Sequence, residues 1–458
     1  MSSESTGTTL EEAMARSLVL EELLGQEQAK EILKRTLSVG TVNSTTSSFA
    51  ERTSKARFLP DDKHQVRDIG RGSCGSVFEI PGTTLAIKKG ANTKAIWNDF
   101  NLTNHAYNSY LTWAGLLSDS FPGRRVPRVP GAQFFNGPDS TEFWQAVLKR
   151  FPKGDRNRAA AFHIDRILPV PQQTRMALVR QFYQDDVQTQ HNVLRNQENK
   201  DCLIRIYLGS NNPSGQAYDD TATLRNFPLY LDQAKLIGID INTYAEEMAI
   251  GLAILHWQAQ IDAADTEFVI GSSTNTTFRT TYPNHEAHAP PTSTNDDFTQ
   301  RETQMWMLDY DKCTKVDLNA KDPRPEVVNK YLVAVTGNDP YFPHPCLDVE
   351  LWQKFRAAYL KSSKMIIRIK GLRAAVATFP GALIDQWEEW GKGDIEAAEF
   401  DPFARDGGGN DEDGGWGSDG LEGEITDSDS EEDEEEEEEE AEEEDDDHDH
   451  DEDGSEET

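Results

Sequence analysis

The last fifty residues of this chain are so acidic that they limit where a folded body can end. Between Gly409 and Thr458 there are 30 Asp and Glu residues and no Lys or Arg. Like charges repel along such a run, and it has few apolar side chains to bury, so it cannot offset the entropy cost of folding. The preceding 408 residues hold 51 acidic and 45 basic side chains, a net charge of −6 out of −36 for the whole chain. We therefore expect a nearly neutral folded body and a disordered acidic tail over residues 396–458.

The N-terminal residues and the cysteines indicate the class of protein. Residues 1–56 are expected to be a mostly disordered extension with an amphipathic helix, because Leu and Ala recur at three- and four-residue spacing between Leu10 and Leu37. No basic start leads into an apolar stretch, and no apolar run approaches the roughly 18 residues of a membrane span. No CxxC pair is present, so no zinc is expected. These features favour a cytoplasmic or nuclear protein that is not secreted and does not act at a membrane. The cysteines are Cys74, Cys202, Cys313 and Cys346.

The pattern of the body is strands first and helices later. A Pro81-Gly82 turn between two apolar runs predicts a hairpin. Asp348 precedes an apolar-periodic stretch and is expected to cap a helix. The order predicts an α+β protein with two lobes. The expected strands are 75–80, 84–88, 159–168, 176–182, 202–208 and 305–310, and the expected helices are 94–117, 229–261 and 348–360.

A glycine-rich segment leads into the predicted hairpin and overlaps its first strand. Residues 69–77 read IGRGSCGSV, a full G-x-G-x-x-G-x-V match. Glycines let backbone N–H groups approach a phosphate without interference from Cβ atoms, and a valine at the last position can pack against a base. Thirteen residues after the third glycine comes Ala86-Ile87-Lys88, so Lys88 would hold phosphates. The predicted cofactor-binding residues are Gly70, Gly72, Gly75, Val77 and Lys88.

Further along the chain, carboxylates fall at positions that resemble those of the protein-kinase pattern, although the gap of 47 residues between Asp262 and Asp309 is longer than the roughly 18 of that pattern. Asp262 stands where a catalytic base would be, and Glu267 five residues later stands where a metal ligand would be. Asp309 ends an apolar run and is followed by an aromatic residue, so it is the second predicted Mg²⁺ ligand. Asp265 competes with Asp262 for the role of base. The predicted catalytic residues are Asp262 and Lys88.

These motifs together resemble the protein-kinase pattern, with departures. Between Lys89 and Leu117 the only acidic residue is Asp99, where a kinase has a glutamate. The Arg of H-R-D is replaced by Ile261, and Asp311 stands in place of the glycine of D-F-G. The resemblance implies a kinase-like fold with a small lobe over 57–210 that includes insertions and a helical lobe over 211–395. ATP and Mg²⁺ are the expected cofactors.

Longer strings resemble a fungal family that is defined by a domain of unknown function and often labelled "zinc finger protein". They are DCLIRIYLG from Asp201, LHWQAQIDAADTEFVIGSS from Leu255, WMLDYDKC from Trp306, NDPYFPHP from Asn338 and LWQKFRAAYL from Leu351. The resemblance implies a fungal origin and assigns no activity. The zinc label has no counterpart in ligand spacing, since His285 and His288 lie in a Ser- and Thr-rich loop without an HExxH pattern.

Two functions remain open from the sequence. The first is a kinase-like protein, either a pseudokinase or an atypical kinase, that binds Mg-ATP. The second is a non-enzymatic interaction protein whose acidic tail binds basic partners such as histones. Direct binding of nucleic acid is not expected, because a polyanion repels phosphates. A basic patch at Arg124, Arg125 and Arg128 is the main cluster of positive charge singled out in the body.

Overall fold

The computed structural model describes residues 29–44, 51, 53, 55–56, 65–274, 298–319 and 324–400, with the backbone alone at 324 and 396–400. The acidic tail, the first 28 residues and the loop that holds His285 and His288 lie outside these ranges. The α+β class is confirmed, because two five-stranded sheets and a set of helices make up the described chain. None of the described helices has the length and apolar character needed to cross a membrane.

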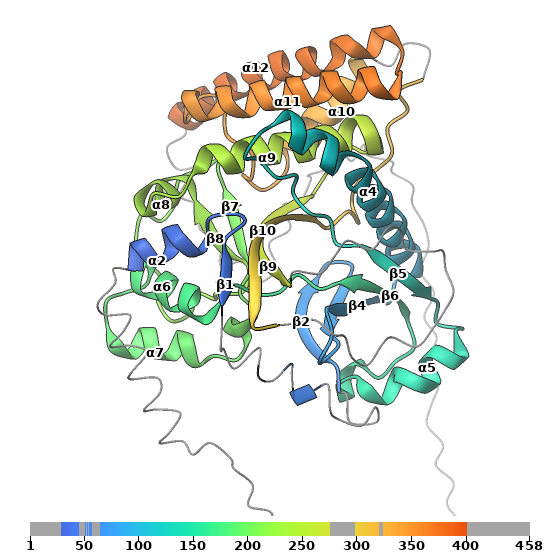
Figure 1. Ribbon diagram of the computed structural model, residues 1–458, viewed down its shortest axis with the longest axis vertical. Helices are drawn as coiled ribbons and strands as arrows, with labels where there is room; N and C mark the ends of the chain where they lie inside the picture. Colours follow the sequence, from blue (N-terminus) through green and yellow to red (C-terminus); the bar gives the residue numbers. More distant parts are fainter. Residues whose placement is uncertain are drawn as a thin grey trace, which may run out of the picture. The chain divides into compact units, whose positions relative to one another are not determined.

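One sheet is antiparallel (Figure 1). It contains the predicted hairpin around Pro81-Gly82, formed by β3 and β4, and a glycine-rich hairpin formed by β2 and β3. Its strand order is β2-β3-β4-β6-β5. Gly82 has a φ of 77° in the predicted turn between β3 and β4, a conformation that glycine adopts without strain. Ile87 and Phe78 point into a core with Phe151, while their neighbours in the strands face the opposite side. The strands are β2 (Arg67–Gly72), β3 (Gly75–Glu79), β4 (Leu85–Gly90), β5 (Ala132–Asn136) and β6 (Ala160–Asp165).

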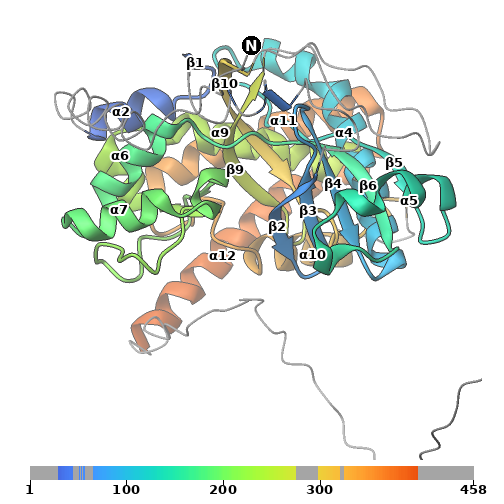
Figure 2. The ribbon, with the colours of Figure 1, turned by 90° about the horizontal axis from the view of Figure 1, so that it is seen from below.

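Helix α4 (Thr93–Ser120) follows β4 and covers this sheet, as Figure 2 shows from below. Asn92 caps the helix by accepting a hydrogen bond from the N–H of Ala95 at 3.1 Å. Ile96 and Phe100 pack on Phe162 of β6 and anchor the first turns of the helix. The predicted helix over 94–117 is confirmed. Its packing on the sheet brings Asp99 close to Lys88 of β4.

The second sheet has the order β1-β10-β9-β7-β8. β7 and β8 are parallel, and the other pairs are antiparallel. Leu308 of β10 pairs with Glu267 of β9, so the chain leaves β10 beside the first residue of β9. The strands are β1 (Val42–Ser44), β7 (Ile204–Tyr207), β8 (Phe227–Tyr230), β9 (Glu267–Thr274) and β10 (Gln300–Leu308).

The described helices other than α5 contribute to the main core beside this sheet. α5 packs against the first sheet, where Phe143 and Trp144 join the core of Phe78 and Ile87. α9 packs on α11, and α2 packs on α6 (Figure 1). The predicted cap at Asp348 is confirmed, since its carboxylate accepts a hydrogen bond from the N–H of Leu351 at 2.9 Å. The helices are α2 (Ala29–Thr36), α5 (Thr141–Val147), α6 (Gln172–Phe182), α7 (Val187–Arg195), α8 (Leu231–Ile237), α9 (Ile241–Ala253), α10 (Arg324–Thr336), α11 (Val349–Lys370) and α12 (Phe379–Phe400).

The predicted strand over 176–182 is wrong, because these residues belong to α6. The helix begins after Pro171, a residue well suited to a helix start, and the strong helix formers Met, Ala, Leu, Arg and Gln fill it. Residues 176–179 are all buried, so their apolar run reflects a helix covered on several sides.

The sequence predicts a small lobe over residues 57–210 and a mostly disordered extension with an amphipathic helix over residues 1–56. In the structure β7 belongs to the second sheet, and β1 pairs with β10. Ile32 and Leu33 of α2 are buried, so the part of the N-terminal segment from Ala29 to Ser44 is integral to the second sheet and its helices.

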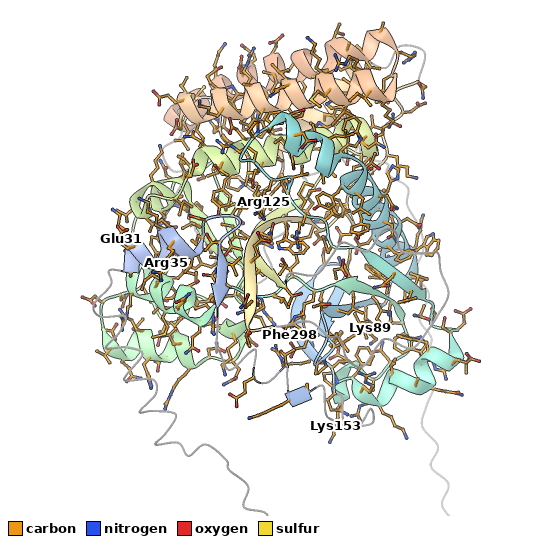
Figure 3. The ribbon with its side chains drawn as sticks, in the orientation of Figure 1. Glu31, Arg35, Lys89, Arg125, Lys153 and Phe298 are labelled. Atoms are coloured by element: carbon orange, nitrogen blue, oxygen red, sulfur yellow. The ribbon has the colours of Figure 1, made fainter. Side chains whose placement is uncertain are left out.

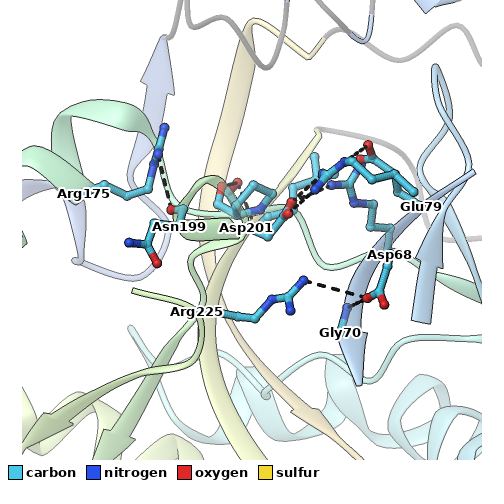
Figure 4. A network of polar contacts seen from close by, with 12 residues as sticks. Asp68, Gly70, Glu79, Arg175, Asn199, Asp201 and Arg225 are labelled. Carbon is cyan, nitrogen blue, oxygen red and sulfur yellow. Dashed lines mark hydrogen bonds and ion pairs between the residues drawn. The ribbon is translucent and has the colours of Figure 1, made fainter. Parts of the chain in front are cut away.

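A network of ion pairs joins the two sheets behind the hairpin (Figure 4). Asp201, in a 3₁₀ turn before β7, accepts hydrogen bonds from Arg67 of β2 at 2.5 and 2.9 Å. Arg166, just after β6, lies 3.4 Å from Asp201 and also pairs with Glu79 of β3. Because these side chains come from both sheets, the network fixes one sheet against the other.

Two arginines of the predicted basic patch form ion pairs with other residues of the folded body. Arg124 pairs with Glu246, and Arg125, labelled in Figure 3, pairs with Glu302 of β10. The N–H of Arg125 donates a hydrogen bond of 2.7 Å to Glu247 of α9. The other carboxylate oxygen of Glu247 has no hydrogen-bond partner in the described part of the chain, and burial raises the pKa of Glu247 to about 8.

Glu247→Gln is expected to remove a pH dependence of folding. A carboxyl whose pKa is raised in the folded protein contributes stability that is present at low pH and lost as pH rises through about 8. The wild-type free energy of unfolding should therefore fall between about pH 5 and pH 8, by at most about 1.4 kcal/mol per pH unit from this group. Gln keeps the acceptor for Arg125 and does not ionise. Urea unfolding at pH 6 and at pH 8 gives the free energy of unfolding of both proteins at each pH. If this free energy changes equally with pH in the wild type and in Glu247→Gln, Glu247 is not the source of the pH dependence.

Candidate functional site

Lys88 is positioned by strand alternation in β4. It pairs with Val77 of β3 and Phe162 of β6, and its side chain points away from the core that holds Ile87. Its neighbour Lys89 points to the opposite face, where its Nζ lies 2.7 Å from the side-chain oxygen of Asn157 (Figure 3). Of the two adjacent lysines, therefore, only Lys88 faces the candidate site.

The ammonium group of Lys88 lies between two carboxylates. Its Nζ is 2.8 Å from Oδ2 of Asp99 and 3.1 Å from Oδ1 of Asp309. Thr103, one turn further along α4, donates a hydrogen bond of 3.1 Å to the other oxygen of Asp99. Burial would lower the pKa of Lys88, but Asp99 and Asp309 outweigh it and raise the pKa above its ordinary value. Lys88 is therefore charged in the folded protein.

Asp99 pairs with Lys88 and stands at the position where the kinase pattern has a glutamate. It is 2% exposed and reaches Lys88 from α4, although it is one methylene shorter than glutamate. The shorter side chain is accommodated because α4 packs directly on the sheet through Phe100 and Ile96. The lysine–carboxylate pair between strand and helix is thus present with Asp in place of Glu.

Asp309 follows the end of β10 with a φ of 64°. A non-glycine residue in the left-handed region is uncommon and is usually held there by its surroundings. Asn98 of α4 donates a hydrogen bond of 3.2 Å to the backbone oxygen of Asp311, which anchors the segment after Asp309. Burial and a hydrogen bond to the Asp311 side chain raise the pKa of Cys74, in the hairpin, to about 11.

The three glycines of the hairpin differ in what they do for the fold. A Cβ on Gly75 would lie 2.4 Å from the backbone oxygen of Lys89, so packing requires glycine there. A Cβ on Gly70 or Gly72 would meet nothing closer than 3.9 Å, and neither has a positive φ. The fold alone therefore does not demand glycine at positions 70 and 72.

These residues surround one pocket, with a volume of about 220 Å³. One wall is apolar, and the other end carries charged groups from both sheets and from α4. Such a combination of an apolar wall and a few convergent charges is typical of a ligand site. The apolar lining residues include Ile69, Val77, Ala86, Ile164, Leu203 and Leu308. The charged groups around Lys88 and Glu267, called the charged end below, are Lys88, Asp99, Arg205, Glu267, Asp309 and Asp311, and Arg71, Asp165 and Arg166 also line the pocket.

Glu267 lines the pocket but is already engaged. It forms an ion pair with Arg205 of β7, and Arg205 also lies 3.3 Å from Asp339. Burial raises the pKa of Glu267 to about 7, Arg205 opposes the shift, and nearby carboxylates including Asp309 add to it. The structure thus brings the predicted metal ligands Glu267 and Asp309 to one pocket but gives Glu267 a cationic partner.

Asp262 is held by Thr314, beside the isolated β-bridge between Ile261 and Lys315. One of its oxygens accepts the N–H of Thr314 at 2.9 Å, and the other accepts the hydroxyl of Thr314 at 2.5 Å. The residue is 4% exposed and is not part of the pocket lining. Asp265, the competing candidate, is exposed and pairs with Lys312 at 2.9 Å. The structure therefore does not place either carboxylate in the pocket.

Backbone strain is concentrated near these residues. Six non-glycine residues in the described ranges have a positive φ, and four of them are Gln260, Ala263, Asp265 and Asp309. A π-helical turn, Ile254–Ala259, leads into this group. Residues in such sparsely populated conformations cluster at functional sites in proteins.

Arg205 was missed by reasoning from the sequence. It lies in an ordinary-looking strand, IRIY, and no motif marks it. The only available signal was an arginine at an alternate position of an apolar strand, which indicates a charged group on one face of a sheet. Its pairing with Glu267 depends on the β7–β9 contact, where Arg205 lies opposite Val269.

Among the described side chains, no group of three or more His, Cys, Asp or Glu is arranged to hold a metal ion. This does not conflict with Mg²⁺ at Asp309, because Mg²⁺ commonly uses one or two carboxylates together with substrate phosphates. All four cysteines are free thiols.

The profile of a family of domains of unknown function, described as "Zinc finger protein", matches residues 305–371. The predicted resemblance to this family is confirmed over that range, which includes Asp309 and all of α11 but neither the glycine-rich hairpin nor Lys88. No curated protein and no protein of known structure shows significant similarity to the chain.

Proposed function

We propose that this protein is kinase-like and binds a nucleoside triphosphate, with ATP and Mg²⁺ as the expected ligands, in the pocket between the hairpin and Asp309. The observation that carries the proposal is the Lys88 ammonium, held between Asp99 of α4 and Asp309 in a pocket roofed by the glycine-rich hairpin. A strand lysine paired with a helix carboxylate, next to an Asp that follows a strand, is the arrangement that holds Mg-nucleotide in kinases.

The order of strands and helix in the first sheet also supports nucleotide binding. The hairpin provides its first two strands, Lys88 lies on the third, and α4 comes next in the chain. Gly70 and Gly72 leave the backbone open on the pocket side although the fold does not require them. Val77 and Ala86 supply an apolar surface of the kind that a base needs.

The protein is further proposed to be a pseudokinase rather than an efficient phosphotransferase. A catalytic Asp must reach the acceptor hydroxyl, and both oxygens of Asp262 are occupied by Thr314. Asp262 and Lys88 remain the predicted catalytic residues should transfer occur. Transfer of the γ-phosphate to a substrate or to water at a rate typical of kinases, on the order of 1–100 per second, would contradict this part.

Binding is tested with the full-length chain. ATP at millimolar concentration, with Mg²⁺, should raise the melting temperature, because a ligand that binds only the folded state stabilises it. Isothermal titration calorimetry gives the affinity. No shift and no heat with ATP, GTP or ADP, in the presence or absence of Mg²⁺, would exclude nucleotide binding.

Gly72→Ala distinguishes an effect on nucleotide binding from an effect on the stability of the fold. A Cβ at position 72 meets nothing closer than 4.0 Å, so the melting temperature of the free protein should stay within about 2 °C of the wild type. The added methyl group restricts the approach of phosphate to the hairpin backbone, so nucleotide affinity should fall roughly tenfold. Gly75→Ala is the matched contrast and should lower the melting temperature itself. Unchanged affinity in Gly72→Ala would count against phosphate contact with the hairpin.

A second function concerns the acidic segment and is independent of the pocket. We propose that residues 411–458 bind basic proteins such as histones, because the charge of this segment is entirely negative over tens of residues. Pull-downs with the full chain and with a chain ending at residue 410 test it at several salt concentrations. The same partners recovered by both chains would contradict this role.

A further inference from the structure

The charged end of the pocket contains a cation that no kinase-like motif accounts for. Arg205 extends from β7 toward Glu267, and its side chain is 25% exposed, within the lining of the pocket. Lys88 lies in the same lining. Arg71 and Arg166 also line the pocket, but Arg71 pairs with Asp68, and Arg166 pairs with Glu79 and Asp201. Lys88 and Arg205, one from each sheet, are the two cations of the charged end.

The position of Arg205 is set by several contacts. One terminal nitrogen of the guanidinium pairs with Glu267, and the other donates a hydrogen bond of 3.3 Å to Asp339. The hydroxyl of Tyr207 donates a hydrogen bond of 2.8 Å to the same Asp339 oxygen. A guanidinium has five N–H donors, so these two carboxylates leave donors available for a further anion. Arg205 is thus held in place without being saturated.

The register of the second sheet brings this pair next to the predicted metal ligand. Glu267 pairs with Leu308, so Asp309 comes one residue after the partner of Glu267. In the kinase pattern the residue at the position of Glu267 holds a second metal ion. Here the charge of Glu267 is met by a guanidinium, which removes much of the attraction for a divalent cation.

We propose that Arg205 takes the place of a second metal ion: its guanidinium contacts the phosphates of the bound nucleotide, Glu267 orients it, and only the ion held by Asp309 is bound. This inference rests on the proposed nucleotide binding. Arginine suits the role because its planar fork matches phosphate oxygens and it stays charged at every accessible pH. Glu267 is then a positioning residue for Arg205 rather than a metal ligand.

Metal stoichiometry tests the proposal. With a saturating non-hydrolysable ATP analogue and Mn²⁺ as the probe, electron paramagnetic resonance should count one Mn²⁺ per wild-type chain. Arg205→Gln should weaken nucleotide binding roughly tenfold, because it loses a hydrogen bond to a charged group. It should also gain a second Mn²⁺, because the carboxylate of Glu267 is released. The double variant Arg205→Gln/Glu267→Gln should show the weaker binding and one Mn²⁺.

Two further variants serve as controls that distinguish the loss of the Arg205 contact from a loss of folding. Arg205→Lys keeps a positive charge and should bind nucleotide within a few-fold of the wild type with one Mn²⁺. Arg356→Gln removes an ion pair between α11 and α12, with Glu388 at 3.1 Å, and should change neither affinity nor metal count. Melting curves of every variant show that the fold is present.

The outcomes separate this inference from the proposed function. Two Mn²⁺ ions in the wild type, or unchanged nucleotide affinity in a folded Arg205→Gln, would overturn the role of Arg205 while nucleotide binding stands. A wild-type chain that binds no nucleotide would overturn both.

Discussion

Lys88→Met is expected to abolish nucleotide binding at millimolar concentration. The substitution removes the positive charge that lies 3.1 Å from Asp309 and leaves Arg205, already paired with Glu267, beside the unpaired carboxylates of Asp99, Asp309 and Asp311 at the charged end of the pocket. A triphosphate entering that end would meet uncompensated negative charge in a partly buried site, where electrostatic interactions are weakly screened. The melting temperature should no longer change on addition of Mg-ATP, and calorimetry should detect no heat of binding.

The loss has to be separated from damage to the fold. Without Lys88 the carboxylate of Asp99, 2% exposed, has no counter-charge, and removing one member of a buried pair is strongly destabilising. Lys88→Met/Asp99→Asn removes the charge of both partners and should melt closer to the wild type, still without responding to nucleotide. Lys153→Met, at an exposed site, is the matched control and should respond as the wild type does. A folded double variant that binds Mg-ATP with wild-type affinity would exclude Lys88 from the site.

Asp201→Asn is expected to have the largest effect on stability. Asp201 accepts hydrogen bonds from Arg67 at 2.5 and 2.9 Å and lies 3.4 Å from Arg166, whose side chain is 3% exposed. Asn keeps the shape but removes the charge, so the two guanidinium groups are left to share Glu79. Breaking a buried pair of this kind costs about 3–5 kcal/mol.

Urea unfolding measures the difference in free energy of unfolding. Glu389→Gln is the matched control, because Glu389 and its partner Lys392 are 77% and 63% exposed and such a pair contributes roughly 0–1 kcal/mol. A loss of less than about 1 kcal/mol in Asp201→Asn would mean that the network shown in Figure 4 adds little to the attachment of the two sheets.

Local signals predicted much of the fold. The Pro81-Gly82 turn, the helix after β4 and the cap at Asp348 all appear where short-range chemistry placed them. The failure at residues 176–182 has a physical cause, because a fully buried apolar run has no period that separates strand from helix. The pairing of β1 with β10, which lie about 260 residues apart in the chain, leaves no local trace at all.

Some residues of the candidate site could also be predicted from the sequence, and others could be found only in the folded chain. The glycine-rich segment and Lys88 are close in the chain, and one hairpin and one strand bring them together. Asp99 was identified as the only acidic residue available, but its reach depended on how closely α4 packs on the sheet. Arg205 could not be found, because its role arises from contacts with Glu267 and Asp339, 62 and 134 residues away.

Sequence information was sufficient for features that depend on neighbouring residues: the acidic composition of the C-terminal segment, the hairpin around Pro81-Gly82, the cap at Asp348, and the motif from residue 69 to 88. Features that depend on charge pairing required the folded chain. The linear order alone does not reveal that Lys88 lies between Asp99 and Asp309, that Glu267 is met by Arg205, or that Asp262 is held by Thr314. An ion pair forms according to distance in space, and that distance is set by how strands pair and helices pack, over separations that no local pattern in the chain encodes.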